Sequence, residues 1–150
     1  MDYREFCQQF TSEIPAAHAV GERYYLVGED LKGFRSGEQR KAHAMGLYLG
    51  MGRRFVPSAA LLTLLAKTSE RKARVKDDKA EWLFLCGRDL FGEAFQSAMK
   101  EGLVLVQNTR DENLGLGFIK PDERHGTLLV NVLDRGNYLR HERVTLPQDK

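Results

Sequence analysis

The sequence is poor in cysteine, tryptophan and proline, with two, one and four of these residues among 150. Cys7 and Cys86 are far apart, so they offer neither the spacing of a metal site nor the density of a disulfide framework. The longest apolar run, residues 55–66, contains polar residues and is too short to cross a bilayer. The N-terminus is charged and has no apolar signal core. We therefore expect a protein of the reducing cytoplasm.

Patterns that indicate catalysis are also missing. The four histidines are scattered without the spacing of metal ligands: His18, His43, His125 and His141. Gly52 is followed by two arginines rather than by the Lys-Ser/Thr of a phosphate-binding loop. Cys86 precedes Gly87-Arg88, which would suit a reactive thiol, but its apolar run favours a small buried hydrophobe. We expect no enzyme activity, no cofactor and no metal.

Charge is distributed unevenly along the chain, although the net charge is only +2. Residues 1–31 carry a net charge of −4, residues 32–54 carry +5, and residues 67–79 carry +3. A basic block of this kind attracts a polyanion such as RNA. A solvated surface explains the same block equally well, so charge alone leaves both interpretations open.

The first 72 residues predict a small N-terminal α/β domain. Residues 2–12 have the pattern of an amphipathic helix, with Tyr3, Phe6, Cys7 and Phe10 on one side. Residues 23–27 predict a strand that ends at Gly28. Residues 43–52 combine apolar residues with glycines, which favours a strand pair over a helix. Pro57 and Ser58 then start a helix that ends at Lys67.

The rest of the chain, residues 73–150, predicts a small β-barrel, and the whole chain is therefore α+β. A charged stretch around residues 68–81 marks the boundary. Residues 82–86 alternate in polarity and predict an opening strand with Trp82, Phe84 and Cys86 in the core. Two strands surround a polar turn at residues 108–113, and another strand begins near Gly126. Several short strands in close succession are typical of barrels.

Three segments of this second half resemble a PUA domain, the small RNA-binding barrel named after pseudouridine synthases and archaeosine transglycosylases. They are "WLFLCGRDLFGEAF" (residues 82–95), "LGLGF" (residues 114–118) and "LDRGNYLRHE" (residues 133–142). With "YYLVGEDL" and "GLYLGMGRRFVPSAALLTLLA" upstream, the chain is similar to the PUA-containing large-ribosomal-subunit biogenesis factors of eukaryotes and archaea. The resemblance implies an N-terminal α/β domain followed by a PUA domain. It also implies a monomeric factor that binds structured ribosomal precursor RNA.

The resemblance places candidate RNA contacts mainly in the closing segment, with Arg88 at the start of the first PUA helix. Arginine forms paired hydrogen bonds with phosphate, and an aromatic ring stacks on a base. Alternatively, Tyr138 packs inside the barrel and Arg140 pairs with Asp134 or Glu142. Two other functions stay open: a protein-interaction adaptor in an RNA–protein assembly, and an accessory RNA-targeting subunit of a modification enzyme. The candidates are Arg53, Arg54, Arg88, Lys100, Arg135, Tyr138, Arg140, His141 and Arg143.

Overall fold

A computed structural model describes residues 1–28, 46–137 and 140. The chain divides into two compact units, residues 1–69 and 70–150, which are described separately below as unit 1 and unit 2. The division falls within the charged stretch, three residues before the predicted boundary between residues 72 and 73. Within the described ranges, no helix is long and apolar enough to cross a membrane.

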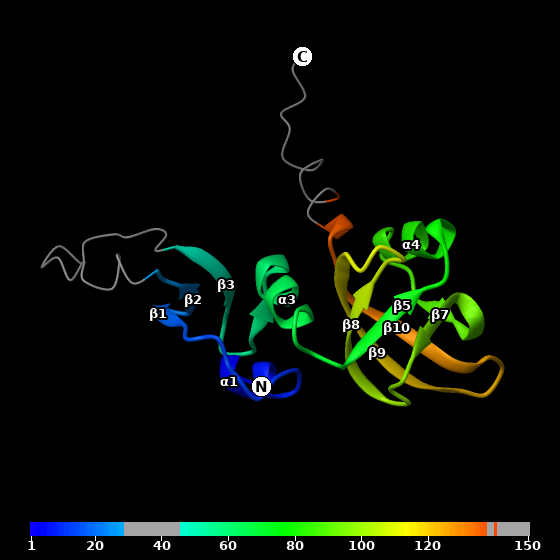
Figure 1. The fold of residues 1–150 in the computed structure, drawn as a ribbon, viewed down its shortest axis with the longest axis horizontal. Helices are drawn as coiled ribbons and strands as arrows, with labels where there is room; N and C mark the ends of the chain where they lie inside the picture. The colour runs from blue at the N-terminus through cyan, green and yellow to red at the C-terminus, as the bar shows by residue number, and fades with distance from the viewer. Residues whose placement is uncertain (29–45, 138–139, 141–150) are drawn as a thin grey trace, which may run out of the picture. The chain divides into compact units, whose positions relative to one another are not determined.

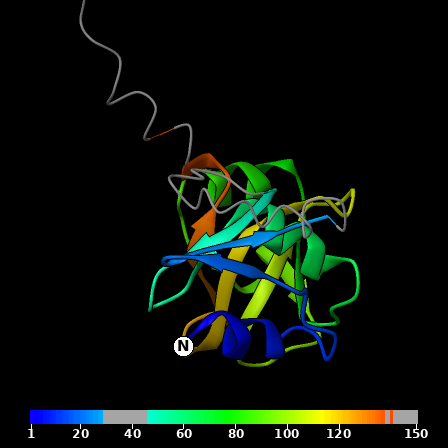
Figure 2. The ribbon, with the colours of Figure 1, turned by 90° about the vertical axis from the view of Figure 1, so that its left-hand side faces the viewer.

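The described residues of unit 1 form two helices and one antiparallel sheet (Figure 1). The sheet has the strand order β1-β2-β3-β4, and neighbouring strands lie side by side in Figure 2. Every strand pair is antiparallel, so the described part of this unit is α+β, and the prediction of an α/β domain is not met. The elements are α1 (Tyr3–Gln8), β1 (His18–Val20), β2 (Arg23–Leu26), β3 (Leu47–Met51), β4 (Val56–Pro57) and α3 (Ala59–Ala66).

Both predicted helices of unit 1 are present and begin at side-chain caps. The Asp2 carboxylate accepts from the Glu5 N–H while the Glu5 carboxylate accepts from the Asp2 N–H, both at 2.9 Å. The Ser58 hydroxyl accepts from the Leu61 N–H at 3.1 Å. The predicted strand pair within residues 43–52 is wrong for the described residues, because β3 is a single strand that pairs with β4 beyond the turn. Residues 43–45 lie outside the described ranges.

The core of unit 1 combines aromatic rings with buried leucines of β3 and α3. Tyr3 stacks on Tyr24 with ring centroids 4.9 Å apart, and Phe55 meets both rings edge-on. Phe6 packs between Phe10 and Phe55 at 5.3 and 5.5 Å. Offset and edge-to-face contacts of this kind add to the stabilisation that burial alone provides. The aromatic residues of the N-terminal helix therefore serve the core, as their spacing predicts.

Unit 2 contains one six-stranded sheet with the order β6-β10-β9-β8-β5-β7. Only the β5–β8 pair is parallel. The two edge strands, β6 and β7, follow each other in the chain through η1, so the sheet curls around its core (Figure 1). The elements are β5 (Lys72–Val75), α4 (Asp78–Leu85), β6 (Leu90–Phe91), η1 (Gly92–Ala94), β7 (Phe95–Ser97), β8 (Gly102–Gln107), β9 (Asn113–Asp122) and β10 (Gly126–Asp134).

The interior of unit 2 is mostly aliphatic. Its helix and curled sheet fit the predicted α+β class. The predicted strands on both sides of the polar turn are present as β8 and β9. Two aromatic rings, those of Phe84 and Phe95, complete a cluster of small and branched side chains. The buried cluster comprises Ala73, Val75, Ala80, Phe84, Leu90, Phe95, Val104, Val106, Leu114, Ile119 and Leu129.

The predicted opening strand at residues 82–86 is wrong: these residues belong to helix α4 and its C-cap. Asp77 caps the helix by accepting from the Ala80 N–H at 2.9 Å. Ala80 and Phe84, one turn apart, form the buried face, as in an amphipathic helix. Trp82 is 63% exposed and Cys86 is also exposed, so neither is a core residue. Arg88 consequently follows this helix and does not begin it.

Candidate nucleic-acid interface

The C-terminal end of α4 is closed by hydrogen bonds from three segments of unit 2. The Arg88 N–H donates to the Leu83 carbonyl at 3.1 Å, and the Gly87 N–H donates to the Phe84 carbonyl at 2.9 Å. This pair of bonds is a Schellman motif, and Gly87 has the positive φ of 82° that the motif requires. The Asn131 side chain, from β10, also donates to the Phe84 carbonyl, at 2.7 Å. The motif fixes the backbone of Arg88 directly beyond the helix.

Arg140 is the last described residue, and its side chain supplies a further hydrogen bond to the C-terminal end of α4. Its guanidinium donates to the Leu85 carbonyl at 2.5 Å and to the Asp134 carboxylate at 2.9 Å. The hydrogen bond to Asp134 raises the pKa of Arg140 above its ordinary value, so the group is always cationic. A Cβ on Gly136 would collide with the Leu85 carbonyl oxygen, so glycine is required for this close approach. The positive charge at a helix C-terminus is favourable.

Three predicted contacts therefore come together at one end of unit 2: Arg88, Arg135 and Arg140, named here the arginine cluster. Arg140 lies against Gly87, the residue before Arg88. Arg135 follows Asp134, the carboxylate that holds Arg140, and its N–H donates to the Leu114 carbonyl at 2.9 Å. Arg88 and Arg135 are exposed. The alternative in which Arg140 pairs with Asp134 is realised, so its guanidinium has a structural role in addition to any contact with a ligand.

The other predicted contacts are not part of this cluster. Lys100 precedes the start of β8. Asp134, beside the cluster, pairs with Gly115 of β9, and Gly115 in turn pairs with Val106 near the other end of β8. The first residue of β8 and Val106 are separated by about 13 Å along the strand, and Lys100 lies before that first residue. Arg53 and Arg54 belong to the turn between β3 and β4 of unit 1, where Arg53 pairs with Glu22 at 3.6 Å. Tyr138, His141 and Arg143 lie outside the described residues.

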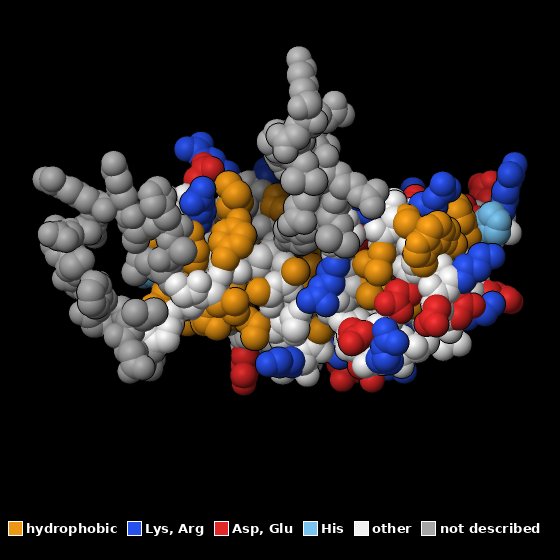
Figure 3. Space-filling model, turned by 90° about the horizontal axis from the view of Figure 1, so that it is seen from above, with side chains coloured by type: hydrophobic (Ala, Val, Ile, Leu, Met, Phe, Trp, Pro, Cys, Tyr) orange, Lys and Arg blue, Asp and Glu red, His pale blue; other side chains and the backbone are white. Residues whose placement is uncertain are grey.

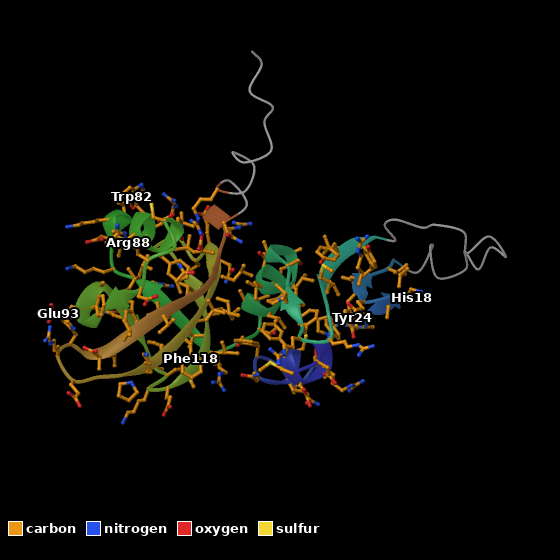
Figure 4. The ribbon with its side chains drawn as sticks, turned by 180° about the vertical axis from the view of Figure 1, so that it is seen from behind. His18, Tyr24, Trp82, Arg88, Glu93 and Phe118 are labelled. Atoms are coloured by element: carbon orange, nitrogen blue, oxygen red, sulfur yellow. The ribbon has the colours of Figure 1, made fainter. Side chains whose placement is uncertain are left out.

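Sequence reasoning missed Trp82 as a surface residue, because it was assigned to the inner face of a strand. In the structure it lies on the exposed side of α4 with Asp78, Lys79 and Cys86. Figure 4 shows Trp82 and Arg88 at the same end of unit 2, with Phe118 at a distance from both. Two signals in the sequence indicate the helix: the capping aspartate at Asp77, and the buried pair Ala80 and Phe84 at helical spacing.

The turn between β8 and β9 is tied to α4 beside the same face. The buried side chain of Asn108 donates to the carboxylates of Glu112 at 2.6 Å and of Glu81 at 3.4 Å. Arg110 donates to Glu112 at 3.3 Å. The hydrogen bonds from Asn108 and Arg110 lower the pKa of the Glu112 carboxyl below its ordinary value. The polar turn predicted at residues 108–113 therefore supports the helix.

Metal ligands do not gather in unit 2 or unit 1, as far as the described residues show: no group of three or more His, Cys, Asp or Glu could hold an ion. Both cysteines are free; Cys7 is buried and Cys86 is exposed. The chemistry available at the end of α4 is accordingly that of hydrogen-bond donation from guanidinium groups and of contact with an indole ring. This combination suits an anionic ligand that also carries flat aromatic groups, as nucleic acids do.

Comparisons with known proteins agree with this geometry. Residues 72–143 match the family model described as the UPF0113 PUA domain. A UPF0113 protein of Archaeoglobus fulgidus is 32% identical over 117 residues, a region that covers 69% of this chain and 66% of that protein, just under two thirds. The solved structure of a conserved PUA domain protein from Thermoplasma acidophilum is similar with a TM-score of 0.57 and 18% identity, over 92% of this chain and 89% of that one. The structural likeness shows a PUA-like β-barrel fold.

Proposed function

We propose, from the premise that residues 72–143 form a PUA domain of the UPF0113 family, that this protein binds structured RNA and catalyses no reaction itself. Proteins with PUA domains generally bind RNA. The observation that carries the proposal is the arginine cluster, which the Schellman motif and the Asp134–Arg140 pair hold at one end of the barrel. The guanidinium of Arg140 is held by Asp134 and the Leu85 carbonyl, and the exposed side chains of Arg88 and Arg135 extend from backbone that hydrogen bonds fix. Guanidinium groups form paired hydrogen bonds with phosphate.

The finer proposal is a role in assembly of the large ribosomal subunit, with ribosomal precursor RNA as the ligand, in the cytoplasm and as a monomer. It is supported by the resemblance of the closing segment and of the upstream segments "YYLVGEDL" and "GLYLGMGRRFVPSAALLTLLA" to that family of factors. Crosslinking of the protein to RNA in cells, followed by sequencing of the bound fragments, tests it. Enrichment of large-subunit precursor sequences supports the role, and a uniform distribution over messenger RNAs contradicts it.

The adaptor alternative also has an observation in its favour. Met51 and Val56 are paired across β3 and β4, and both side chains are about half exposed. Leu47 lies exposed on the same strand as Met51. Exposed apolar side chains that adjoin one another are typical of protein-binding surfaces. An adaptor would retain its protein partners after nuclease treatment, whereas partners bridged by RNA would be lost.

The direct test is the salt dependence of RNA affinity, measured by anisotropy of a labelled hairpin RNA. Each phosphate contact contributes about 0.7–0.9 to the slope of log affinity against log salt. The double variant Arg88→Ala/Arg135→Ala should therefore lower the magnitude of the slope by about 1.4–1.8. The matched control is Lys120→Ala/Arg124→Ala, which removes the same charge from exposed positions at the opposite end of β10. An equal loss in both variants, or no binding at low salt, contradicts the proposal.

A further inference from the structure

We propose that Trp82 is a stacking platform for an unpaired base, so that the preferred RNA carries a single-stranded nucleotide beside its helical part. This inference rests on the proposed RNA-binding function and adds the class of RNA that the site selects. Its basis is the exposed indole ring of Trp82, whereas the other large apolar side chains on α4 are buried or half-buried.

The surroundings of the ring suit a base better than they suit an apolar protein surface. The exposed side of α4 consists of Asp78, Lys79, Trp82 and Cys86, so Trp82 is the one large apolar group on it. Figure 3, which looks onto the end with α4, shows apolar side chains of unit 2 bordered by basic and acidic ones. The exposed indole therefore presents a flat face, with charged side chains nearby, on which a base can stack.

The position of the ring is fixed by the helix that carries it. Asp77 caps the N-terminus of α4, the Schellman motif and Arg140 close its C-terminus, and Phe84 anchors it in the core. The Trp82 carbonyl itself accepts from the Cys86 N–H at 3.0 Å. A rigid backbone limits the entropy lost when a base docks, because only the side-chain torsions of Trp82 are still free.

Cations lie on both sides of Trp82 along the chain. Lys79 is three residues earlier on the same helix, which places the two side chains next to each other on its surface. Arg88 is bonded through its N–H to the carbonyl of Leu83, the residue after Trp82. A nucleotide whose base stacks on the indole would therefore have donors for its own phosphate and for the adjacent one.

The other exposed rings of unit 2 lack this arrangement. Phe91 is 48% exposed, and its ring packs against His125 with centroids 4.9 Å apart. Phe118 lies on β9 away from α4, as Figure 4 shows. Among the described residues, Trp82 has no aromatic partner. Bases in a duplex are stacked on one another and cannot reach the ring, so only a loop, a bulge or an overhang can use it.

The test uses the fact that Trp82 is the only tryptophan in the chain, so fluorescence excited selectively at tryptophan reports on this ring and not on the five tyrosines. The full-length protein is titrated with a hairpin RNA that has an unpaired loop and with a blunt duplex of the same stem. Stacking predicts quenching by the hairpin and little change with the duplex. Trp82→Ala should weaken hairpin binding by about 5- to 150-fold, the range for loss of one stacked base. Duplex affinity should not change.

Two variants control for loss of structure and for general aromatic effects. Trp82→Phe keeps a smaller ring and should restore most of the hairpin affinity. Phe91→Ala removes another exposed ring from the same unit and should leave the affinity unchanged. Circular dichroism must show that every variant is folded. A Phe91→Ala loss as large as that of Trp82→Ala would overturn the assignment to Trp82.

The outcomes separate this inference from the proposed function. If the protein binds both RNAs equally, without quenching, and Trp82→Ala keeps full affinity, the stacking inference is wrong while RNA binding stands. If neither RNA binds at low salt, the proposed function itself fails. If Trp82→Ala changes only the sedimentation behaviour of the free protein, the ring belongs to a contact between protein chains and the inference is overturned.

Discussion

The two units of this chain use aromatic residues in opposite ways. In unit 1, Tyr3 and Phe6 both pack on Phe55, and the three rings form part of the core beside buried leucines. In unit 2, the core is mainly aliphatic, and Trp82 and Phe91 lie at the surface. Lys79 on α4 and Arg88 just beyond it lie near the exposed ring of Trp82. We therefore propose that the buried rings of unit 1 contribute to its stability, whereas the exposed ring of Trp82 in unit 2 serves recognition.

The largest expected effect is the loss of stability when a buried ring is removed from unit 1, compared with the removal of the exposed ring from unit 2. Phe6→Ala should lower the free energy of unfolding by about 3–5 kcal/mol, because it deletes a buried aromatic side chain. Trp82→Ala should change it by about 0.5 kcal/mol or less, because the ring is already in solvent. Chemical denaturation monitored by circular dichroism measures both. Equal losses of stability in the two variants would contradict the division of roles.

The same aromatic residues show which parts of the secondary structure the sequence could predict. The spacing of Tyr3, Phe6, Cys7 and Phe10 predicts a helix with one buried face, and α1 has that face. At residues 82–86 a short apolar run is compatible with the period of a helix and with that of a strand, and its alternation in polarity predicts a strand. What decides the structure is the pair of end signals, Asp77 and Gly87, which lie outside the run itself. The capping residues at its two ends therefore make this segment a helix, although the polarity of its residues alternates as in a strand.

The candidate site could be predicted only in part, for a similar reason. The closing motif identified Arg135 and Arg140, and the glycine of that motif is needed where the chain passes the Leu85 carbonyl. Sequence could not show that Lys100 lies at the other end of β8 from the arginine cluster, since that depends on the antiparallel registers of β8 with β9 and of β9 with β10. It also could not show that Arg140 caps a helix 55 residues earlier in the chain.

The two cysteines provide the next comparison of the units. Burial raises the pKa of the Cys7 thiol, a larger influence than the opposing hydrogen bond with Tyr3, so little reactive thiolate forms near neutral pH. Cys86 is exposed at the end of α4. A maleimide or disulfide reagent should therefore modify Cys86 at least ~100-fold faster than Cys7, which requires local opening. Peptide mapping by mass spectrometry after brief labelling distinguishes them. Comparable rates would show that α1 does not protect Cys7.

The smallest effect concerns Arg140, which has both a structural and a proposed binding role. Arg140→Ala leaves the buried carboxylate of Asp134 without its ion-pair partner, so we expect a lower melting temperature. The double variant Asp134→Ala/Arg140→Ala removes that uncompensated charge and should recover part of the loss. RNA affinity should stay reduced in both variants. If the double variant also recovers RNA affinity, Arg140 only positions the segment and does not contact the ligand.

The central claim is that RNA meets unit 2 at the end that carries α4 and the arginine cluster. Ultraviolet crosslinking of the full-length protein to the hairpin RNA, with mass-spectrometric mapping of the modified peptides, tests it most directly. The account predicts crosslinks within residues 78–90 and 133–140, with Trp82 among the modified side chains. Crosslinks confined to residues 18–27 and 47–57 of unit 1, or to the turn at residues 120–126, would contradict it.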